Sequence, residues 1–176
     1  MKNSFAFLLF SILVSNLTGC SDSELEMAGL TEEQRRRIYS DVINRYHAVI
    51  KYSEAGELEN MLAYFDPEGP GIYIDGTTRY TSLDDMMVNS RATWKVAKQD
   101  YGIPETKVFV LSPVYVLINS SSILTTTYRD GTAFEPRPWS LSTLWLLRDG
   151  QWLIHSFHQN SGEMKKVEVE APPPSQ

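Results

Sequence analysis

Residues 144 to 162, LWLLRDGQWLIHSFHQNSG, decide how this chain folds. On both sides of Asp149-Gly150 the residues follow a period of two and are rich in β-branched and aromatic side chains, which is typical of strands. An Asp-Gly pair accepts positive φ angles at little cost and is a frequent hairpin turn. The stretch therefore predicts two antiparallel strands joined by a tight turn.

The same period extends upstream to about residue 105. Strands are expected over 107 to 119, 123 to 129, 139 to 148 and 151 to 158. Asp130-Gly131 supplies a second hairpin turn. Pro113 interrupts the first long strand, so a bulge or bend is expected there. These strands form an antiparallel meander.

Helices come before the strands. Thr31 to Gln34 has the form of a capping box, and apolar residues then recur every three or four positions to Ile50, which indicates a long amphipathic helix. A short helix is expected over Leu58 to Phe65, a strand over Ile72 to Asp75, and a third helix from Ser82, with an inner stripe that reaches Trp94 and Ala97. Helices followed by an antiparallel sheet predict an α+β fold with the helices on one face.

This order of elements, with GIYIDG at residues 71 to 76 and the ending quoted above, resembles the nuclear transport factor 2-like superfamily in its SnoaL-like branch. The ending is also similar to the association domain of calcium/calmodulin-dependent kinase II. The matching positions are Gly150, Trp152, Phe157, His158, Ser161 and Gly162. The resemblance spans about 31 to 162 and implies a curved sheet wrapped by three helices into a cone, with a mostly apolar pocket at its open end. The superfamily contains isomerases, cyclases, dehydratases, oligomerisation domains and transport factors, so the fold leaves the function open.

The first twenty residues form a separate unit. A basic start with Lys2 precedes an apolar stretch of about ten residues, too short for a bilayer of roughly 30 Å and typical of a signal peptide. Leu17-Thr-Gly-Cys20 resembles the lipobox of bacterial lipoproteins. The resemblance implies an acylated Cys20 that anchors the protein in the cell envelope, and Ser21 implies the outer membrane, facing the periplasm. The alternative is an ordinary signal peptide in which Cys20 occurs by chance.

Composition limits the domain count and the partners. With 176 residues, of which 42% are apolar, the chain has room for one sizeable core. We expect a signal peptide over 1–19, the acylated cysteine and a tether over 20–30, one domain over 31–165, and a flexible Pro-rich tail over 166–176. The formal charge is −6 and the longest basic run is a triplet of arginines, which argues against nucleic acid as a partner.

Several chemistries are excluded by missing motifs. A single cysteine permits neither an internal disulfide nor a zinc site of the paired-cysteine type. The sequence also lacks a phosphate-binding Gly-rich loop, a His-Glu-x-x-His motif, a Gly-x-Ser-x-Gly elbow and an EF-hand loop. No cofactor and no metal are expected.

Two histidines lie in the last strand. An offset of three places His155 and His158 on opposite faces of a straight strand. By this parity Trp152, Ile154, Ser156 and His158 share one face, and Leu153, His155, Phe157 and Gln159 share the other. His158 matches the histidine of the family's terminal strand, which favours a position toward the pocket or toward an interface. The alternative is a half-buried histidine bonded to a backbone carbonyl or a carboxylate.

Asp75 is the candidate base. In enzymes of this fold a carboxylate near the pocket often takes a proton from the substrate, and a partner such as His158 or a tyrosine would stabilise the developing oxyanion. The alternative is a plain turn, since Asp75 precedes Gly76. Candidate ligand-binding residues are Tyr46, Tyr73, Trp94, Tyr115, Tyr128 and His155. Such aromatic residues are more often core. The stretch from Glu135 to Trp139, with two prolines around Arg137, suits a pocket rim, a subunit contact or an extended edge.

Three functions are compatible with these features. The first is a lipid-anchored module that binds a small apolar or carboxylate ligand or a protein partner. The second is a SnoaL-like isomerase, dehydratase or cyclase that uses Asp75 as base. The third is an oligomerisation domain, since sheets of this superfamily commonly pair two subunits into a homodimer. Depending on parity, that interface would contain Trp145 and Leu147 or Leu144 and Leu146.

Overall fold

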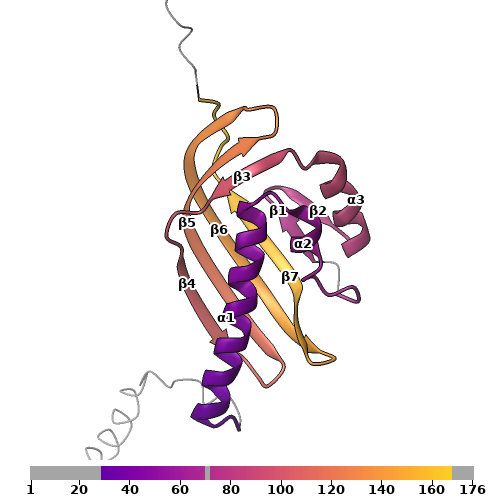
Figure 1. Cartoon of the computed structure of the whole chain (residues 1–176). Coiled ribbons are helices and arrows are strands. Elements are labelled where there is room, and N and C mark those ends of the chain that lie inside the picture. Colours follow the sequence, from indigo (N-terminus) through magenta and orange to yellow (C-terminus); the bar gives the residue numbers. More distant parts are fainter. Residues whose placement is uncertain (1–28, 70–71, 168–176) are drawn as a thin grey trace, which may run out of the picture.

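The computed structural model describes residues 29–69 and 72–167, so the expected signal peptide, Cys20 and nearly all of the tail lie outside the described residues (Figure 1). The helices are α1 (Glu32–Glu54), α2 (Leu58–Leu62) and α3 (Leu83–Thr93). The strands are β1 (Tyr73–Asp75), β2 (Thr78–Tyr80), β3 (Val96–Asp100), β4 (Glu105–Val110), β5 (Tyr115–Tyr128), β6 (Ala133–Arg148) and β7 (Gln151–Ser161).

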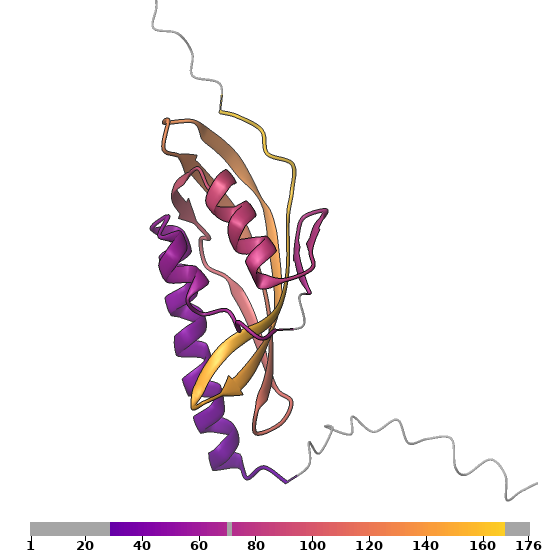
Figure 2. The same ribbon diagram turned by 90° about the vertical axis from the view of Figure 1, so that its right-hand side faces the viewer.

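The predicted capping box starts α1. The Thr31 hydroxyl accepts a hydrogen bond from the Gln34 backbone N–H at 3.2 Å, and Gln34 Oε1 accepts one from the Thr31 N–H at 2.8 Å. The helix runs along one side of the curved sheet (Figure 2). It buries Val42, Tyr46 and Val49 against the sheet, as the apolar spacing predicted. This contact closes one side of the molecule.

The seven strands form one curled sheet in the order β2-β1-β7-β6-β5-β3, with β4 also paired to β5. Together with the N-terminal helices this is the expected α+β cone. One detail differs: β1 runs parallel to β7, so the sheet is mixed rather than wholly antiparallel. The segment after α2 already runs parallel to β7, with a bridge from Phe65 to Ile154, and β1 then pairs with β7 in the same direction.

Three predicted boundaries change. The third helix ends at Thr93 because Trp94 adopts an extended backbone with ψ of 104°, and Ala97 therefore lies in strand β3 rather than on a helical stripe. Strands β2 and β3 were not predicted. The bend expected at Pro113 occurs, and it separates β4 from β5, which pair as a hairpin. Strand β5 then runs unbroken from Tyr115 to Tyr128, where two strands divided between 119 and 123 were expected.

A bulge in β7 corrects the predicted parity. Leu144 lies opposite Ser156 but Trp145 lies opposite Ile154, so His155 is an extra residue in β7. Beyond the bulge the faces exchange. Residues Trp152, Ile154, Phe157 and Gln159 face the inside of the curve, whereas Ser156, His158 and Asn160 face outward. The prediction that Ile154 and His158 share a face is wrong for this reason.

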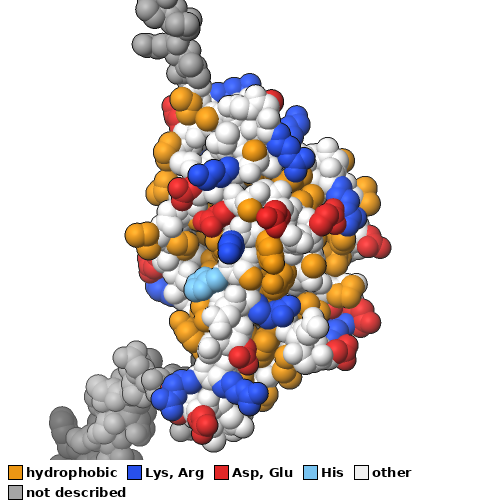
Figure 3. Space-filling view, in the orientation of Figure 1, with side chains coloured by type: hydrophobic (Ala, Val, Ile, Leu, Met, Phe, Trp, Pro, Cys, Tyr) orange, Lys and Arg blue, Asp and Glu red, His pale blue; other side chains and the backbone are white. Residues whose placement is uncertain are grey.

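Charges are mixed on the face of the molecule that carries α1, where Lys and Arg side chains alternate with Asp and Glu (Figure 3). Within 29–69 and 72–167, no helix has the length and apolar character needed to cross a bilayer. The buried core is strongly aromatic, and Trp145, Tyr46 and Tyr73 are its largest fully buried side chains.

Candidate functional site

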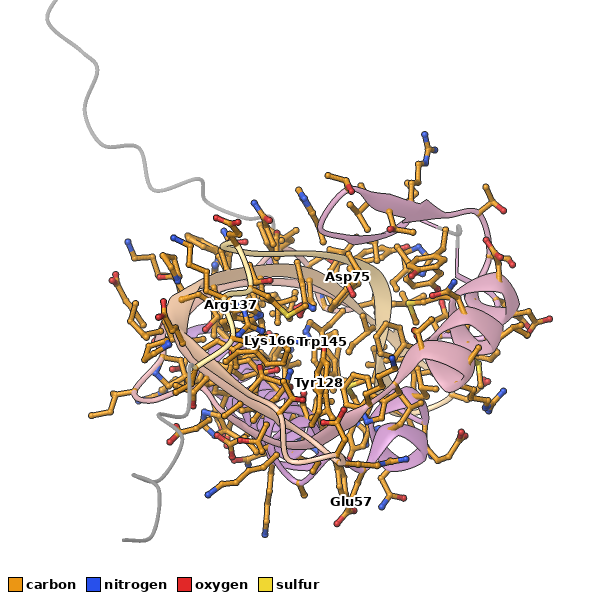
Figure 4. The ribbon with its side chains drawn as sticks, turned by 90° about the horizontal axis from the view of Figure 1, so that it is seen from above. Glu57, Asp75, Tyr128, Arg137, Trp145 and Lys166 are labelled. Carbon is orange, nitrogen blue, oxygen red and sulfur yellow. The ribbon has the colours of Figure 1, made fainter. Side chains whose placement is uncertain are left out.

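A cavity of about 120 Å³ lies inside the curve of the sheet. Helices α1, α2 and α3 cover it on one side, and the inner faces of β6 and β7 form the other. Its walls include the indoles of Trp94, Trp139 and Trp145 and the phenol of Tyr101. The rings of Tyr101 and Trp139 pack against each other, with centroids 4.6 Å apart. Viewed from above, Trp145 lies inside the ring of elements and Glu57 lies outside it (Figure 4).

Trp94 is held in the wall by the end of α1. Its indole Nε1 donates a hydrogen bond to the Gly56 carbonyl at 3.1 Å. Gly56 has a φ of +70°, and a Cβ there would lie 2.8 Å from the Val96 carbonyl oxygen. Only glycine therefore lets the chain after α1 approach β3 this closely.

A polar cluster forms another part of the wall. Ser53 Oγ and Tyr101 Oη each lie within hydrogen-bond distance of Gln99 Oε1, at 2.7 and 2.8 Å, and they are 2.9 Å from each other. No described residue accepts a hydrogen bond from the Gln99 side-chain amide. The cluster thus combines two hydroxyls and an unused amide donor beside an aromatic wall.

Asp75 lies at the edge of the cavity, where its side chain is exposed. A chain of hydrogen bonds connects it to the wall. Trp139 Nε1 donates to Gln159 Oε1 at 3.2 Å, and Gln159 Nε2 donates to Asp75 Oδ1 at 3.1 Å. The carboxylate is therefore oriented by an amide, not by a histidine or a tyrosine.

The cavity tyrosines keep their protons near neutral pH and cannot act as bases, and the Tyr46 hydroxyl is buried without a hydrogen-bond partner among the described residues. Burial raises the pKa of Tyr101 far above its ordinary value and also raises the pKa of Tyr46. The pKa of Tyr80 is raised by burial and by the carboxylates of Asp75 and Asp85. All three hydroxyls stay protonated near neutral pH. Tyr80 donates its proton to Asn89 Oδ1 at 3.0 Å.

Three of the predicted site residues line this cavity, namely Asp75, Tyr46 and Trp94. The other ligand-binding candidates do not. Tyr73 is fully buried beside it and donates to the Asp66 carbonyl at 3.3 Å. Tyr128 packs on Phe134 with ring centroids 4.7 Å apart. Tyr115 and His155 meet edge to face on the outer side of the sheet, with ring centroids 6.1 Å apart.

His155 belongs to a separate charged cluster. Its Nδ1 lies 2.8 Å from Oδ2 of Asp66, a carboxylate with no exposed surface. Asp66 also accepts from the Glu68 backbone N–H at 3.1 Å, and an Arg148 nitrogen lies 3.3 Å away. The half-buried histidine bonded to a carboxylate, which was the alternative for His158, is therefore found at His155 instead. It fastens the segment after α2 to the bulge of β7.

His158 is exposed and lines a shallow groove on the outer face with Asn119 and Ser142. It therefore lies across the sheet from the cavity that Asp75 lines. The bulge at His155 causes this separation. The two residues predicted as a catalytic pair are not brought together.

Sequence reasoning missed Ser53, Gln99 and Tyr101. Ser53 continues the inner stripe of α1 four residues after Val49, so its spacing was a usable signal. Gln99 and Tyr101 gave none, because β3 itself was not predicted. In the part of the chain that the structure describes, no group of three His, Cys, Asp or Glu side chains is arranged to hold a metal ion.

Comparison of folds places this geometry among solved structures. No family model and no curated protein sequence matches the chain. A hexachlorocyclohexane dehydrochlorinase, LinA type 3, from Novosphingobium barchaimii superposes with a TM-score of 0.60 at 8% identity, over 82% of this chain and 100% of that one. The association domain of CaMKII from C. elegans gives 0.53 at 10% identity, over 74% and 99%. An NTF-2 like protein of unknown function from Shewanella oneidensis gives 0.53 at 10% identity, over 70% and 98%.

The fold is the nuclear transport factor 2-like cone. Identities at this level carry the fold and nothing about the reaction. In this chain the inside of the cone is aromatic, with neutral hydrogen-bonding groups and one carboxylate at the edge. That arrangement suits holding a small molecule.

Proposed function

We propose that this domain binds a small, mainly apolar molecule inside the cone, and that it does so as a lipid-anchored protein of the cell envelope. The observation that carries the binding proposal is the cavity itself: an aromatic wall of Trp94, Trp139, Trp145 and Tyr101 with one polar cluster. Binding pockets commonly combine apolar walls with a few placed polar groups.

The size of the cavity limits the ligand. About 120 Å³ is below the usual range for drug-sized ligands and close to the volume of an engineered protein cavity that holds benzene, roughly 150 Å³. The ligand is therefore about as large as one aromatic ring. Ser53, Gln99 and Tyr101 supply hydrogen bonds for a single polar group at one end of it.

The geometry favours binding over acid–base catalysis. Proton transfer needs a base and an acid within reach of one substrate. Asp75 is exposed and bonded to Gln159, and His158 lies on the other face of the sheet. An enzyme that uses Asp75 with a cavity tyrosine remains the alternative. It differs from a binding module in requiring the Asp75 carboxylate for turnover.

Phenol is a suitable first probe, because it pairs one aromatic ring with one hydroxyl. Residues 21–176 keep every described element, and three cavity tryptophans provide the fluorescence signal. We expect saturable quenching that weakens about 5- to 10-fold in Tyr101→Phe, which removes one hydrogen bond of about 1 kcal/mol. Tyr128→Phe is the matched control outside the cavity and should bind as the unmodified chain does. Linear, unsaturable quenching in all three proteins would contradict the proposal.

The anchor is tested separately. Expression of the whole chain with its own N-terminus in a bacterium with two membranes, with a radiolabelled fatty acid, should label the protein and place it in the outer-membrane fraction. Cys20→Ala should abolish the label and release the domain from the membrane. Labelling that persists in Cys20→Ala would refute the anchor.

Pairing of two copies is a second candidate function, favoured by the outer face of the sheet. Leu144 and Leu146 lie there half-buried, whereas Trp145 is fully buried on the inner face. The pair considered for the interface is therefore Leu144 and Leu146. Solved association domains share the fold. Sedimentation equilibrium should give a dimer, and Leu144→Asp should shift it toward monomer.

A further inference from the structure

Arg137 is the charged side chain that neither the cavity nor the outer face explains. It has 6% of its surface exposed and lies on the inner face of β6, where its Cα pairs with Leu124. Trp139, two residues further on the same face, forms the cavity wall. Arg137 is thus the next inward-facing residue beyond the cavity, and Figure 4 shows it inside the ring of elements.

The guanidinium is only partly satisfied. One nitrogen, Nη2, donates to the Thr126 hydroxyl at 2.9 Å. The Nε and Nη1 atoms are buried and have no hydrogen-bond partner. Among the ion pairs formed by described residues, none involves Arg137. A guanidinium remains charged inside proteins, so this one is a buried cation without an anion.

Such a group is costly to keep. Buried charges are normally paired, and each unsatisfied N–H loses the hydrogen bond it would make in water. The backbone around Arg137 is restricted, because the fixed φ angles of Pro136 and Pro138 on either side limit rotations that would turn the side chain outward. Burial also lowers the pKa of Arg137, opposed only by Tyr128 and Tyr101. The described residues therefore supply no counter-charge for this guanidinium.

We infer that Arg137 is an anion site at the upper end of the cone and that it takes a small carboxylate. A carboxylate matches the planar guanidinium, because its two oxygens accept the N–H groups that Thr126 leaves unused. The anion has to be small, because the neighbouring residues Leu124, Phe134 and Trp139 on β5 and β6 are themselves buried. The site lies beyond the Tyr101–Trp139 pair and does not require the cavity to be filled.

Acetate is the probe, with sodium chloride at equal ionic strength as its control. In ¹⁵N-labelled residues 21–176, the Arg137 Nε–H signal is assigned by its loss in Arg137→Met. We expect acetate to move this signal saturably and chloride to leave it in place. A signal that ignores acetate, or that responds equally to chloride, would overturn the inference and leave Arg137 satisfied by ordered water.

Thermal unfolding gives an independent readout. Acetate should raise the Tm of the unmodified chain, and the dissociation constant for acetate should increase about 10- to 100-fold in Arg137→Met, as expected for charge-assisted hydrogen bonds. Arg91→Met is the matched control, since Arg91 is exposed and paired with Glu59. It should keep the full acetate response, and loss of that response in both variants would overturn the inference. Should Arg137→Met fail to fold, Arg137→Lys, which lacks the guanidinium Nε–H, provides both the assignment and the comparison.

Because phenol reports on the cavity and acetate on Arg137, the two proposals fail separately. Phenol binding without an acetate response would remove the anion site alone. An acetate response without phenol binding would remove the proposed ligand of the cavity alone.

Discussion

The two faces of β6 differ sharply in what they present. On the inner face Trp139, Leu141 and Trp145 are buried around the cavity. On the outer face the alternating residues are Ser140, Ser142 and Leu144, of which none is buried. One strand therefore carries an aromatic cavity wall on one side and a hydroxyl-rich surface with an apolar end on the other.

In β7 the bulge at His155 determines which side chains face the cavity and which face outward. Without the bulge at His155, the parity of Ile154 would have brought His158 inside, next to Asp75. With it, Phe157 and Gln159 turn inward instead, and the ionisable imidazoles of β7 stay off the cavity. A single extra residue thus makes the difference between a cavity that contains a histidine and one that holds aromatic and amide groups.

The largest effect on stability is expected when one side chain on each face of β6 is shortened to alanine. Trp145→Ala removes a fully buried indole and should lower the free energy of unfolding by about 3–5 kcal/mol. Leu144→Ala, half-buried on the outer face, should lower it by about 1 kcal/mol in the monomer. Urea unfolding measures both. Equal losses at low protein concentration would contradict the assignment of inside and outside.

A smaller loss is expected at the bulge. Asp66→Asn weakens the charge-assisted contacts to His155 and Arg148 and should lower the free energy of unfolding by about 1–3 kcal/mol. Asp41→Asn, on the exposed side of α1, is the control and should change it by less than about 0.5 kcal/mol. Phenol affinity should be unchanged in both, because neither residue lines the cavity. A loss of phenol binding in Asp66→Asn alone would show that the Asp66–His155 cluster affects the cavity, which would contradict this prediction.

The decrease in stability at alkaline pH reports on the buried tyrosine hydroxyls. Burial and the nearby Asp66 raise the pKa of Tyr73 to about 12, against about 10 in an unfolded chain. Below pH 10 both states keep the proton and the stabilising contribution is complete. It is lost as pH rises from about 10 to about 12, because only the unfolded state releases the proton there. Tyr73→Phe should flatten the decline measured by urea unfolding across this range, and an unchanged slope would refute the assignment.

The smallest effect is expected at the two residues predicted as a catalytic pair. His158→Ala removes an exposed outer side chain and should change phenol affinity by less than about twofold and stability by less than about 0.5 kcal/mol. Asp75→Asn preserves the hydrogen bond from Gln159 through the remaining carbonyl oxygen. It should therefore also bind phenol nearly normally. A tenfold loss of phenol affinity in either variant would show that the residue contributes to binding, which would contradict this prediction.

How much the sequence could predict depends on the range of the interaction. The cap at Thr31 and the turn at Asp149-Gly150 follow from local chemistry, and both occur. The α+β arrangement follows from the switch in period and also from the resemblance. The bulge at His155 could not be predicted, because it depends on how β7 meets β6 and the Phe65–Asp66 segment rather than on residues near it in sequence.

The candidate site was partly predicted for the same reason. Tyr46 and Trp94 line the cavity as expected, since helix period and burial place them. The polar cluster was missed because Ser53, Gln99 and Tyr101 come from α1, β3 and the residue after β3. Only the tertiary contact between α1 and β3 brings those hydroxyls and that amide together.

The most direct test of the central claim is native mass spectrometry of residues 21–176 purified without added ligand. The binding account predicts a bound small molecule of about one aromatic ring that is lost in Trp94→Ala and kept in His158→Ala. A protein that carries no such molecule, and that gains none when phenol is added before ionisation, would contradict the claim that the aromatic inside of the cone is a ligand site.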